Sequence, residues 1–150
     1  MTSKTSRVYV DTNVVIRVME HTDEASAAIA GVFQRAVDGE LRLVTSELTL
    51  SEALVVPVGQ GDDFLAQAYG KLLHQSELFD LRPITQHILI EAAYVRARRT
   101  LQLPDAIHVA TAEAERCGLM LSFDRRLQGS GAFDVIGPSD PRVAAGERSG

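Results

Sequence analysis

Residues 7–20 read RVYVDTNVVIRVME and contain the first change from strand to helix along the chain. Residues 7–10 are β-branched and aromatic, which favours a short strand. Residues 12–20 have the apolar spacing of a helix, and Asp11 stands at the junction between the two. A strand that leads directly into a helix is the first unit of an alternating α/β fold.

The alternation continues to the end of the chain. Further strands are predicted at 41–45, 78–84, 119–123 and 133–137. Further helices are predicted at 25–37, at 64–73, from about 86 to 101 after a Thr85 cap, from Pro104 to about Gly118, and after a Ser46 cap as far as a loop that Pro57 begins. Such a pattern predicts a parallel sheet covered by helices on both faces, with its ligand site beyond the carboxyl ends of the strands.

Length and composition indicate one domain. A chain of 150 residues that is 45% hydrophobic can bury one core, which we place at residues 1–137, followed by a flexible tail at 138–150. The single cysteine, Cys117, cannot form an internal disulfide, and the first residues lack an apolar leader. No apolar stretch approaches the roughly 20 residues that cross a bilayer. These features predict a cytoplasmic protein with no membrane segment.

The net charge of −5 argues against nucleic-acid binding, which usually depends on a basic surface. Bound divalent cations would change this balance, because two Mg²⁺ add +4 and leave about −1. Thirteen of the fifteen basic residues are arginines. Arginine suits bidentate contact with phosphate, although a GC-rich genome gives the same bias.

Four acids lie where this fold would bring them together. Asp11 and Asp124 follow predicted strands, so both carboxylates lie at the same edge of a parallel sheet. Asp105 opens one helix, and Glu52 lies about one and a half turns into another. Clustered carboxylates without histidine or cysteine partners favour Mg²⁺ or Mn²⁺ over zinc.

Each of these acids also has an ordinary structural interpretation. Asp11 can cap the helix that follows it, Asp105 can be a first-turn acid beside Pro104, and Asp124 can begin an Asx turn. Glu52 can be a solvated residue on an amphipathic helix. The spacing alone therefore permits a four-acid pocket without proving it.

Four motifs in order resemble those of PIN-domain ribonucleases, a family that includes the VapC toxins of type II toxin–antitoxin pairs. They are VDTNVVI (10–16), SELTLSEAL (46–54), LPDAIHVATA (103–112) and LSFD (121–124). The resemblance runs from about residue 7 to 136 and implies a three-layer α/β/α sandwich with a central, mainly parallel sheet. It assigns the catalytic and metal-binding roles to Asp11, Glu52, Asp105 and Asp124, with Asn13 and Ser122 as neighbouring polar residues. Glu47 is not the family glutamate.

The resemblance implies an Mg²⁺- or Mn²⁺-dependent endoribonuclease whose products carry 5′-phosphate and 3′-hydroxyl ends. It also implies an antitoxin that inserts an arginine into the site, and a homodimer. Many relatives carry a further acid where this chain has Arg125 and Arg126, so a second metal ion is expected to bind weakly. Those arginines either hold RNA phosphates or are solvated, and the same alternatives apply to the basic run that contains Arg96 and Arg99.

Other classes fit the sequence less well. Haloacid-dehalogenase and receiver folds also place aspartates at strand ends, but they use a lysine after a later strand, whereas Lys71 lies within a predicted helix. They also carry a second acid two residues after the first, where this chain has Asn13. A solitary PIN ribonuclease of RNA processing and a non-catalytic PIN-fold binding module remain alternatives. His108 is predicted to be a buried, hydrogen-bonded histidine. The RNA target cannot be inferred.

Overall fold

The structure is a computed structural model that describes residues 5–144, and within them five strands form a single sheet. The strands are β1 (Ser6–Val10), β2 (Leu41–Ser46), β3 (Phe79–Arg82), β4 (Leu119–Leu121) and β5 (Asp134–Ile136). Every neighbouring pair is parallel, in the order β3-β2-β1-β4-β5. From β1 the chain continues to β2 and β3 on one side of that strand, and β4 and β5 lie on its other side. The carboxyl ends of these two strands therefore mark the place where open α/β sheets bind ligands.

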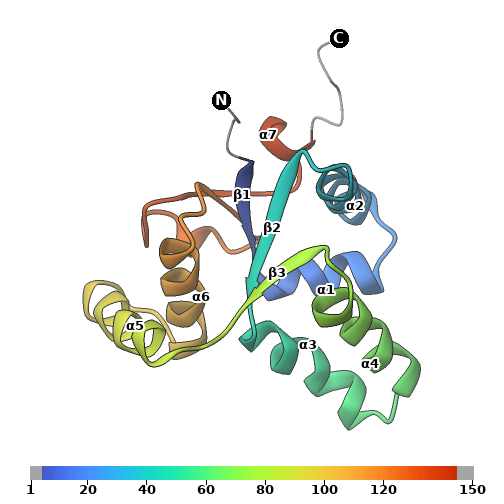
Figure 1. The fold of residues 1–150 in the computed structure, drawn as a ribbon, viewed down its shortest axis with the longest axis horizontal. Coiled ribbons are helices and arrows are strands. Elements are labelled where there is room, and N and C mark those ends of the chain that lie inside the picture. Colours follow the sequence, from blue (N-terminus) through green and yellow to red (C-terminus); the bar gives the residue numbers. More distant parts are fainter. Residues whose placement is uncertain (1–4, 145–150) are drawn as a thin grey trace.

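Helices cover both faces of this sheet (Figure 1). The elements on one side are α1 (Thr12–Glu20), α2 (Glu24–Val37), α3 (Leu48–Gly59), α4 (Asp63–Gly70) and the π-helical turn η1 (Lys71–Gln75). Those on the other side are α5 (Gln86–Arg98) and α6 (Leu103–Ala114). A short 3₁₀ helix, η2 (Arg125–Leu127), follows β4. The predicted three-layer α/β/α sandwich is confirmed.

The core is divided by the sheet, and β1 contributes to both halves. Val8 and Val10 face the core beneath α1 to α4, whereas Tyr9 faces the core beneath α5 and α6. Successive side chains of a strand point to opposite faces, so an apolar strand without alternation is expected where both faces are covered. All three side chains are buried. This anchors the strand that ends at Asp11.

Side-chain caps begin several helices as the sequence predicted. Thr85 accepts a hydrogen bond from Ile88 N at 3.1 Å and caps α5. Ser46 accepts one from Leu48 N at 3.0 Å at the start of α3, although the cap position itself is Glu47. Asp11 caps α1. Asp11 therefore caps a helix, as its ordinary structural interpretation predicted, and any chemical role must be compatible with this cap.

Several boundaries differ from the sequence prediction; for example, α5 ends at Arg98 instead of about residue 101, and α6 ends at Ala114 instead of about Gly118. Helix α3 continues through Pro57 to Gly59, because the proline lies in the last turn, is buried, and interrupts little of the helical hydrogen bonding there. The helix predicted to end at residue 73 is extended by η1 to Gln75. Strand β4 ends at Leu121 instead of residue 123, because Asp124 N donates to Ser122 Oγ at 2.9 Å and turns the chain.

The segment after residue 137 contains a short helix, α7 (Pro141–Ala144), where the sequence predicted a flexible tail. Arg142 pairs with Asp134 and Asp140, each at 2.9 Å, and its carbonyl oxygen accepts from Arg35 Nη1 at 3.1 Å. These contacts hold residues up to 144 against the domain. The rest of the predicted tail, 145–150, lies outside the described residues. None of the described helices is long and apolar enough to cross a membrane.

Candidate active site

Asp11 occupies the point where β1 ends and α1 begins. One carboxylate oxygen, Oδ1, accepts from Thr12 N at 2.9 Å, and the other, Oδ2, accepts from the Ser122 hydroxyl at 2.8 Å. Asp11 N also donates to Leu121 O at 3.0 Å, which ties the end of β1 to β4. The side chain is 8% exposed. Asp11 is therefore a fixed, nearly buried carboxylate at the predicted edge of the sheet.

Ser122 connects two of the predicted acids. Its hydroxyl donates to Asp11 and accepts from Asp124 N, so it orients Asp11 and sets the start of the turn that carries Asp124. The predicted neighbour Asn13 is different. Its side chain is exposed, and no hydrogen bond joins it to another residue of the described chain. The buried polar neighbour on α1 is Thr12, which the sequence did not single out.

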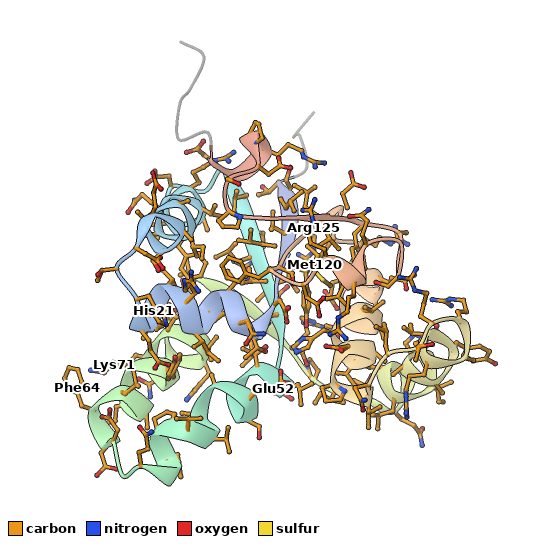
Figure 2. All side chains as sticks on the ribbon, turned by 180° about the vertical axis from the view of Figure 1, so that it is seen from behind. His21, Glu52, Phe64, Lys71, Met120 and Arg125 are labelled. Atoms are coloured by element: carbon orange, nitrogen blue, oxygen red, sulfur yellow. The ribbon has the colours of Figure 1, made fainter. Side chains whose placement is uncertain are left out.

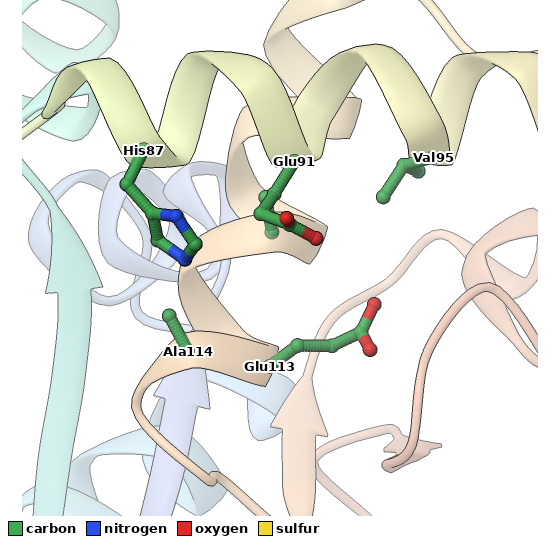
Figure 3. Close-up of a pocket in the computed structure, with 6 residues that line it drawn as sticks. His87, Glu91, Val95, Glu113 and Ala114 are labelled. Atoms are coloured by element: carbon green, nitrogen blue, oxygen red, sulfur yellow. The ribbon is translucent and has the colours of Figure 1, made fainter.

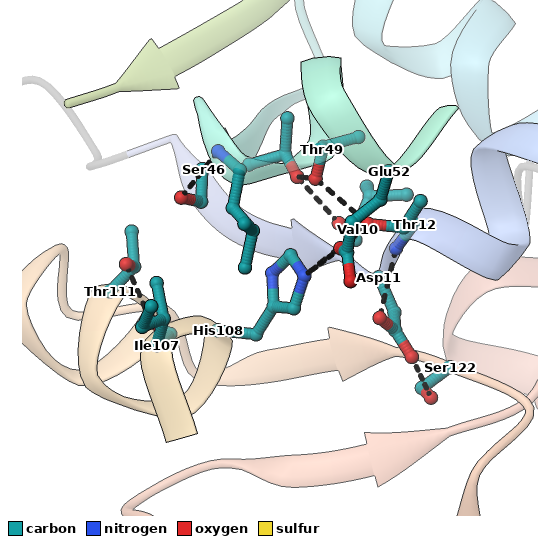
Figure 4. Close-up of polar contacts among 12 residues, drawn as sticks. Val10, Asp11, Thr12, Ser46, Thr49, Glu52, Ile107, His108, Thr111 and Ser122 are labelled. Carbon is teal, nitrogen blue, oxygen red and sulfur yellow. Dashed lines mark hydrogen bonds and ion pairs between the residues drawn. The ribbon is translucent and has the colours of Figure 1, made fainter. Parts of the chain in front are cut away.

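Glu52 extends from α3 and is held by two donors on one oxygen. The Thr12 hydroxyl and His108 Nε2 both contact Glu52 Oε1 at 2.7 Å (Figure 4). Burial acts to raise the pKa of Glu52, but these two hydrogen bonds outweigh it and place that pKa below its ordinary value. Glu52 is therefore ionised at neutral pH. One of its oxygens is engaged by the protein.

A buried chain of hydrogen bonds lies behind Glu52. The Tyr9 hydroxyl contacts His108 Nδ1 at 2.5 Å, and His108 is 2% exposed. Burial raises the pKa of Tyr9 well above its ordinary value, so the phenol keeps its proton beside the imidazole. His108 Nε2 in turn donates a hydrogen bond to the ionised carboxylate of Glu52. The prediction of a buried, hydrogen-bonded histidine is confirmed, and its partner is a site acid.

Asp105 and Asp124 lie on the more open side of the site, together with Arg126. The Arg126 guanidinium binds Asp124 through two contacts, at 2.9 and 2.6 Å, and lies 3.8 Å from Asp105 Oδ2. The pKa of Asp105 is raised by burial and by the negative charges of Asp11 and Asp124, against the opposing charge of Arg126. The pKa of Asp124 is lowered, chiefly by its hydrogen bond from Arg126.

Neighbouring carboxylates repel one another, and a bound cation would relieve this repulsion. Within residues 5–144, no three histidine, cysteine, aspartate or glutamate side chains converge closely enough to hold a metal ion in the present arrangement. The donor set nevertheless fits one. Carboxylate oxygens are the ligands that Mg²⁺ and Mn²⁺ prefer. Burial raises the pKa of Asp105, and the negative charges of Asp11 and Asp124 raise it further.

The other predicted arginines have mostly structural contacts. Arg99 Nη2 donates to the carbonyl oxygens of Arg126 and Gln128 at 3.0 and 3.2 Å, which fixes the segment after Asp124. Arg96 Nε donates to Leu101 O at 3.3 Å and supports the loop before α6. Arg125 is exposed. Arg96 and Arg99, at the end of α5, therefore help to position the loops of the site.

A surface pocket between α5 and α6 also contains residue types that bind metals. His87 and Glu91 of α5 and Glu113 of α6 line it, but their polar groups do not converge (Figure 3). Glu113 instead lies 3.6 Å from Arg98. The acids at the ends of β1 and β4 are thus the stronger candidate for the active site.

The fold and the site define a class: a three-layer α/β/α protein with carboxylates at the switch point of a parallel sheet. The model of the PIN domain family matches residues 8–129. This chain belongs to the PIN domain family. The comparison with curated protein sequences finds no match.

Several solved structures share the fold. A toxin–antitoxin complex from Klebsiella pneumoniae has 23% identity and a TM-score of 0.64, covering 87% of this chain and 97% of that chain. VapBC2 from Rickettsia felis, bound to a promoter DNA fragment, has 8% identity and a TM-score of 0.67, with coverages of 87% and 98%. Mycobacterium tuberculosis VapC20, a sarcin-ricin loop cleaving toxin, has 17% identity and a TM-score of 0.63, with coverages of 79% and 90%.

Proposed function

We propose that this protein is an endoribonuclease that depends on Mg²⁺ or Mn²⁺ and serves as the toxin of a toxin–antitoxin pair. The observation that carries the proposal is that Ser122 connects Asp11 to the turn of Asp124, while Arg126 pairs with Asp124 and lies 3.8 Å from Asp105. Burial and the charges of Asp11 and Asp124 raise the pKa of Asp105. Membership of the PIN domain family and the similarity to toxin structures support the proposal.

The acids would hold the divalent cation, and the residues behind them would fix the acids. Asp11, Glu52, Asp105 and Asp124 are the proposed ligands. Ser122 orients Asp11, while Thr12 and His108 occupy one oxygen of Glu52 and leave the other available. A bound cation supplies a water that is deprotonated near neutral pH and relieves charge on the phosphoryl oxygens. Water attack in line would release the 3′ oxygen and leave 5′-phosphate and 3′-hydroxyl ends.

Neutralising Asp11 is the experiment that tests the nuclease proposal. Asn at this position can still accept from Thr12 N, so the fold should persist while cation binding is lost. RNA cleavage by Asp11→Asn in Mg²⁺ should fall by at least about 100-fold. Cleavage at the wild-type rate would remove the catalytic assignment. RNA binding without cleavage by the wild-type chain would favour the non-catalytic module.

An antitoxin would inhibit the site with an arginine. The position of Arg126 between Asp124 and Asp105 supports this, because it demonstrates that a guanidinium can occupy the acidic side of the site. A small protein encoded next to this one should bind the wild-type chain more tightly than the Glu52→Gln, Asp105→Asn double variant. Equal binding, or no binding neighbour at all, would leave a solitary PIN ribonuclease of RNA processing.

We also infer a homodimer in solution. The apolar surface that supports it lies on α3 and α4, at Val55, Val56, Val58 and Phe64, and Val37 is the large exposed apolar side chain of α2. Phe64 is 87% exposed and extends away from the body of the molecule (Figure 2). Exposed apolar clusters of this kind commonly mark self-association.

A further inference from the structure

Phe123 is an exposed aromatic side chain at the edge of the acid site. It stands between Ser122, which holds Asp11, and Asp124, yet its own side chain is 38% exposed. Five of the eight aromatic residues of the chain are buried, and the exposed ones besides Phe123 are Phe64 and Tyr94. Those two lie on α4 and α5, and neither is next to a proposed metal ligand in the sequence. Phe123 is thus the aromatic residue that substrate at the acids would meet.

Arg17 covers one side of the Phe123 ring. Its guanidinium carbon lies 5.4 Å from the ring centroid, within the range of a cation–π contact. Asp23, the N-cap of α2, holds the same guanidinium through Nη2 at 3.0 Å and Nε at 3.1 Å. The ring and the guanidinium therefore form a small platform, built from the loop after β4 and the last turn of α1 and fixed from α2.

The charge of the protein makes such a platform important for RNA. With 20 acidic against 15 basic residues and a net charge of −5, the chain offers little of the overall phosphate attraction that usually supplies affinity. Unpaired bases are recognised largely by stacking on aromatic rings and on arginine guanidinium planes. Stacking tolerates any base because every base has a π-face.

We propose that Phe123 and Arg17 form a stacking site for an unpaired nucleobase of single-stranded RNA, next to the phosphate that is cleaved. This inference rests on the proposed ribonuclease function and names where its substrate binds. It predicts that affinity depends on the aromatic character of residue 123, and that apolar size alone does not replace it.

The test uses the full chain carrying Asp11→Asn, so that RNA is bound without being cut. Binding of a short labelled single-stranded RNA in Mg²⁺ is measured for Phe123→Ala, Phe123→Leu and Phe123→Trp, with Tyr94→Ala as the control at an exposed aromatic residue of α5. Alanine and leucine should weaken binding roughly ten- to hundred-fold, whereas tryptophan and the Tyr94 control should bind like the parent. Leucine keeps the apolar bulk and thus separates stacking from folding.

A second readout follows from the absence of tryptophan in the chain. In Phe123→Trp the new indole is the sole tryptophan, and a stacked base should quench its fluorescence, while RNA should leave Tyr94→Trp unchanged. In the active chain, Phe123→Ala should raise KM more than it lowers kcat.

Parent-like affinity for both Phe123→Ala and Phe123→Leu, or RNA binding without quenching, would overturn the stacking site alone. A wild-type chain that neither binds nor cleaves RNA would overturn the proposed function as well.

Discussion

Two clusters of charged side chains lie against the same sheet, and their charges are balanced differently. Near the amino end of β1, Arg7 contacts Asp80 and Glu115 at 2.9 Å, and Arg82 contacts Glu115 at 3.0 Å and Asp80 at 3.5 Å. Two cations therefore meet two anions. At the carboxyl ends of β1 and β4, Arg126 pairs with Asp124 and lies 3.8 Å from Asp105, whereas Asp11 and Glu52 form no ion pair with an arginine or lysine of the described residues.

The pKa values follow this difference. For Arg7, burial acts to lower the pKa, but the hydrogen bond and charge of Asp80 outweigh it and raise the pKa, which stabilises the charged form. For Asp105, burial and the charges of Asp11 and Asp124 raise the pKa, which disfavours the charged form. The first cluster serves the stability of the fold. In the second cluster, Asp105 costs the fold stability, whereas the hydrogen bonds that lower the pKa values of Glu52 and Asp124 stabilise it. Perturbed acids of this kind are typical of sites that act on a ligand.

Apart from the loss predicted for Asp11→Asn, the largest effect is expected at His108, which contacts the acid cluster through Glu52. His108→Ala removes the donor that fixes Glu52 Oε1 and should weaken Mn²⁺ binding roughly 10- to 100-fold, the usual range for the partners of metal ligands. His108→Gln retains an amide donor and should recover part of the affinity. Calorimetric titration of Mn²⁺ measures both. Equal loss in the two variants, with the fold intact, would contradict a positioning role.

An intermediate effect is expected in the balanced cluster. Glu115→Gln removes the charge that both Arg7 and Arg82 contact, and the partial exposure of these side chains places the loss between those of exposed and buried ion pairs. The free energy of unfolding should fall by roughly 1 to 2 kcal/mol, measured by urea denaturation. RNA cleavage per folded molecule should not change. A loss of cleavage without a loss of stability would remove the distinction between the clusters.

The smallest effect is expected at Asp105, where removing the charge should raise the free energy of unfolding instead of lowering it. Because the folded pKa of Asp105 lies above its ordinary value, the contribution of this group to stability decreases as the pH rises from the ordinary value through the raised one. Asp105→Asn should remove that decrease and stabilise the metal-free protein near neutral pH by about 1 kcal/mol or less. Thermal unfolding between acid and neutral pH measures it. Destabilisation across this range would show that Asp105 is not repelled by its neighbours.

The sequence predicted the layers and the place of the acids because both follow from local patterns. Asp11 and Asp124 come directly after strands, and parallel strands share an edge. Contacts between distant residues were not predictable in this way. The partners of Glu52 are Thr12 and His108, which lie 40 and 56 positions away from it.

The contact of Arg126 was not predictable from the sequence either, although its partner lies in the same turn. Its sequence position predicted either phosphate contact or solvation, whereas its side chain folds back onto Asp124 two residues earlier. Pro57 was predicted to end a helix, and only its burial in the last turn of α3 accounts for the helix continuing. Side-chain direction and tertiary burial, which no local pattern encodes, decided both cases.

The central claim is that the unbalanced acids at the ends of β1 and β4 hold a divalent cation. Calorimetric titration of Mn²⁺ into the wild-type chain, Asp11→Asn and Glu115→Gln tests this most directly, because the two variants each remove one negative charge from a different cluster. Wild type and Glu115→Gln should bind Mn²⁺ with the same affinity, and Asp11→Asn should bind at least about 100-fold more weakly. Equal binding by Asp11→Asn and wild type, or no binding by the wild-type chain, would contradict it.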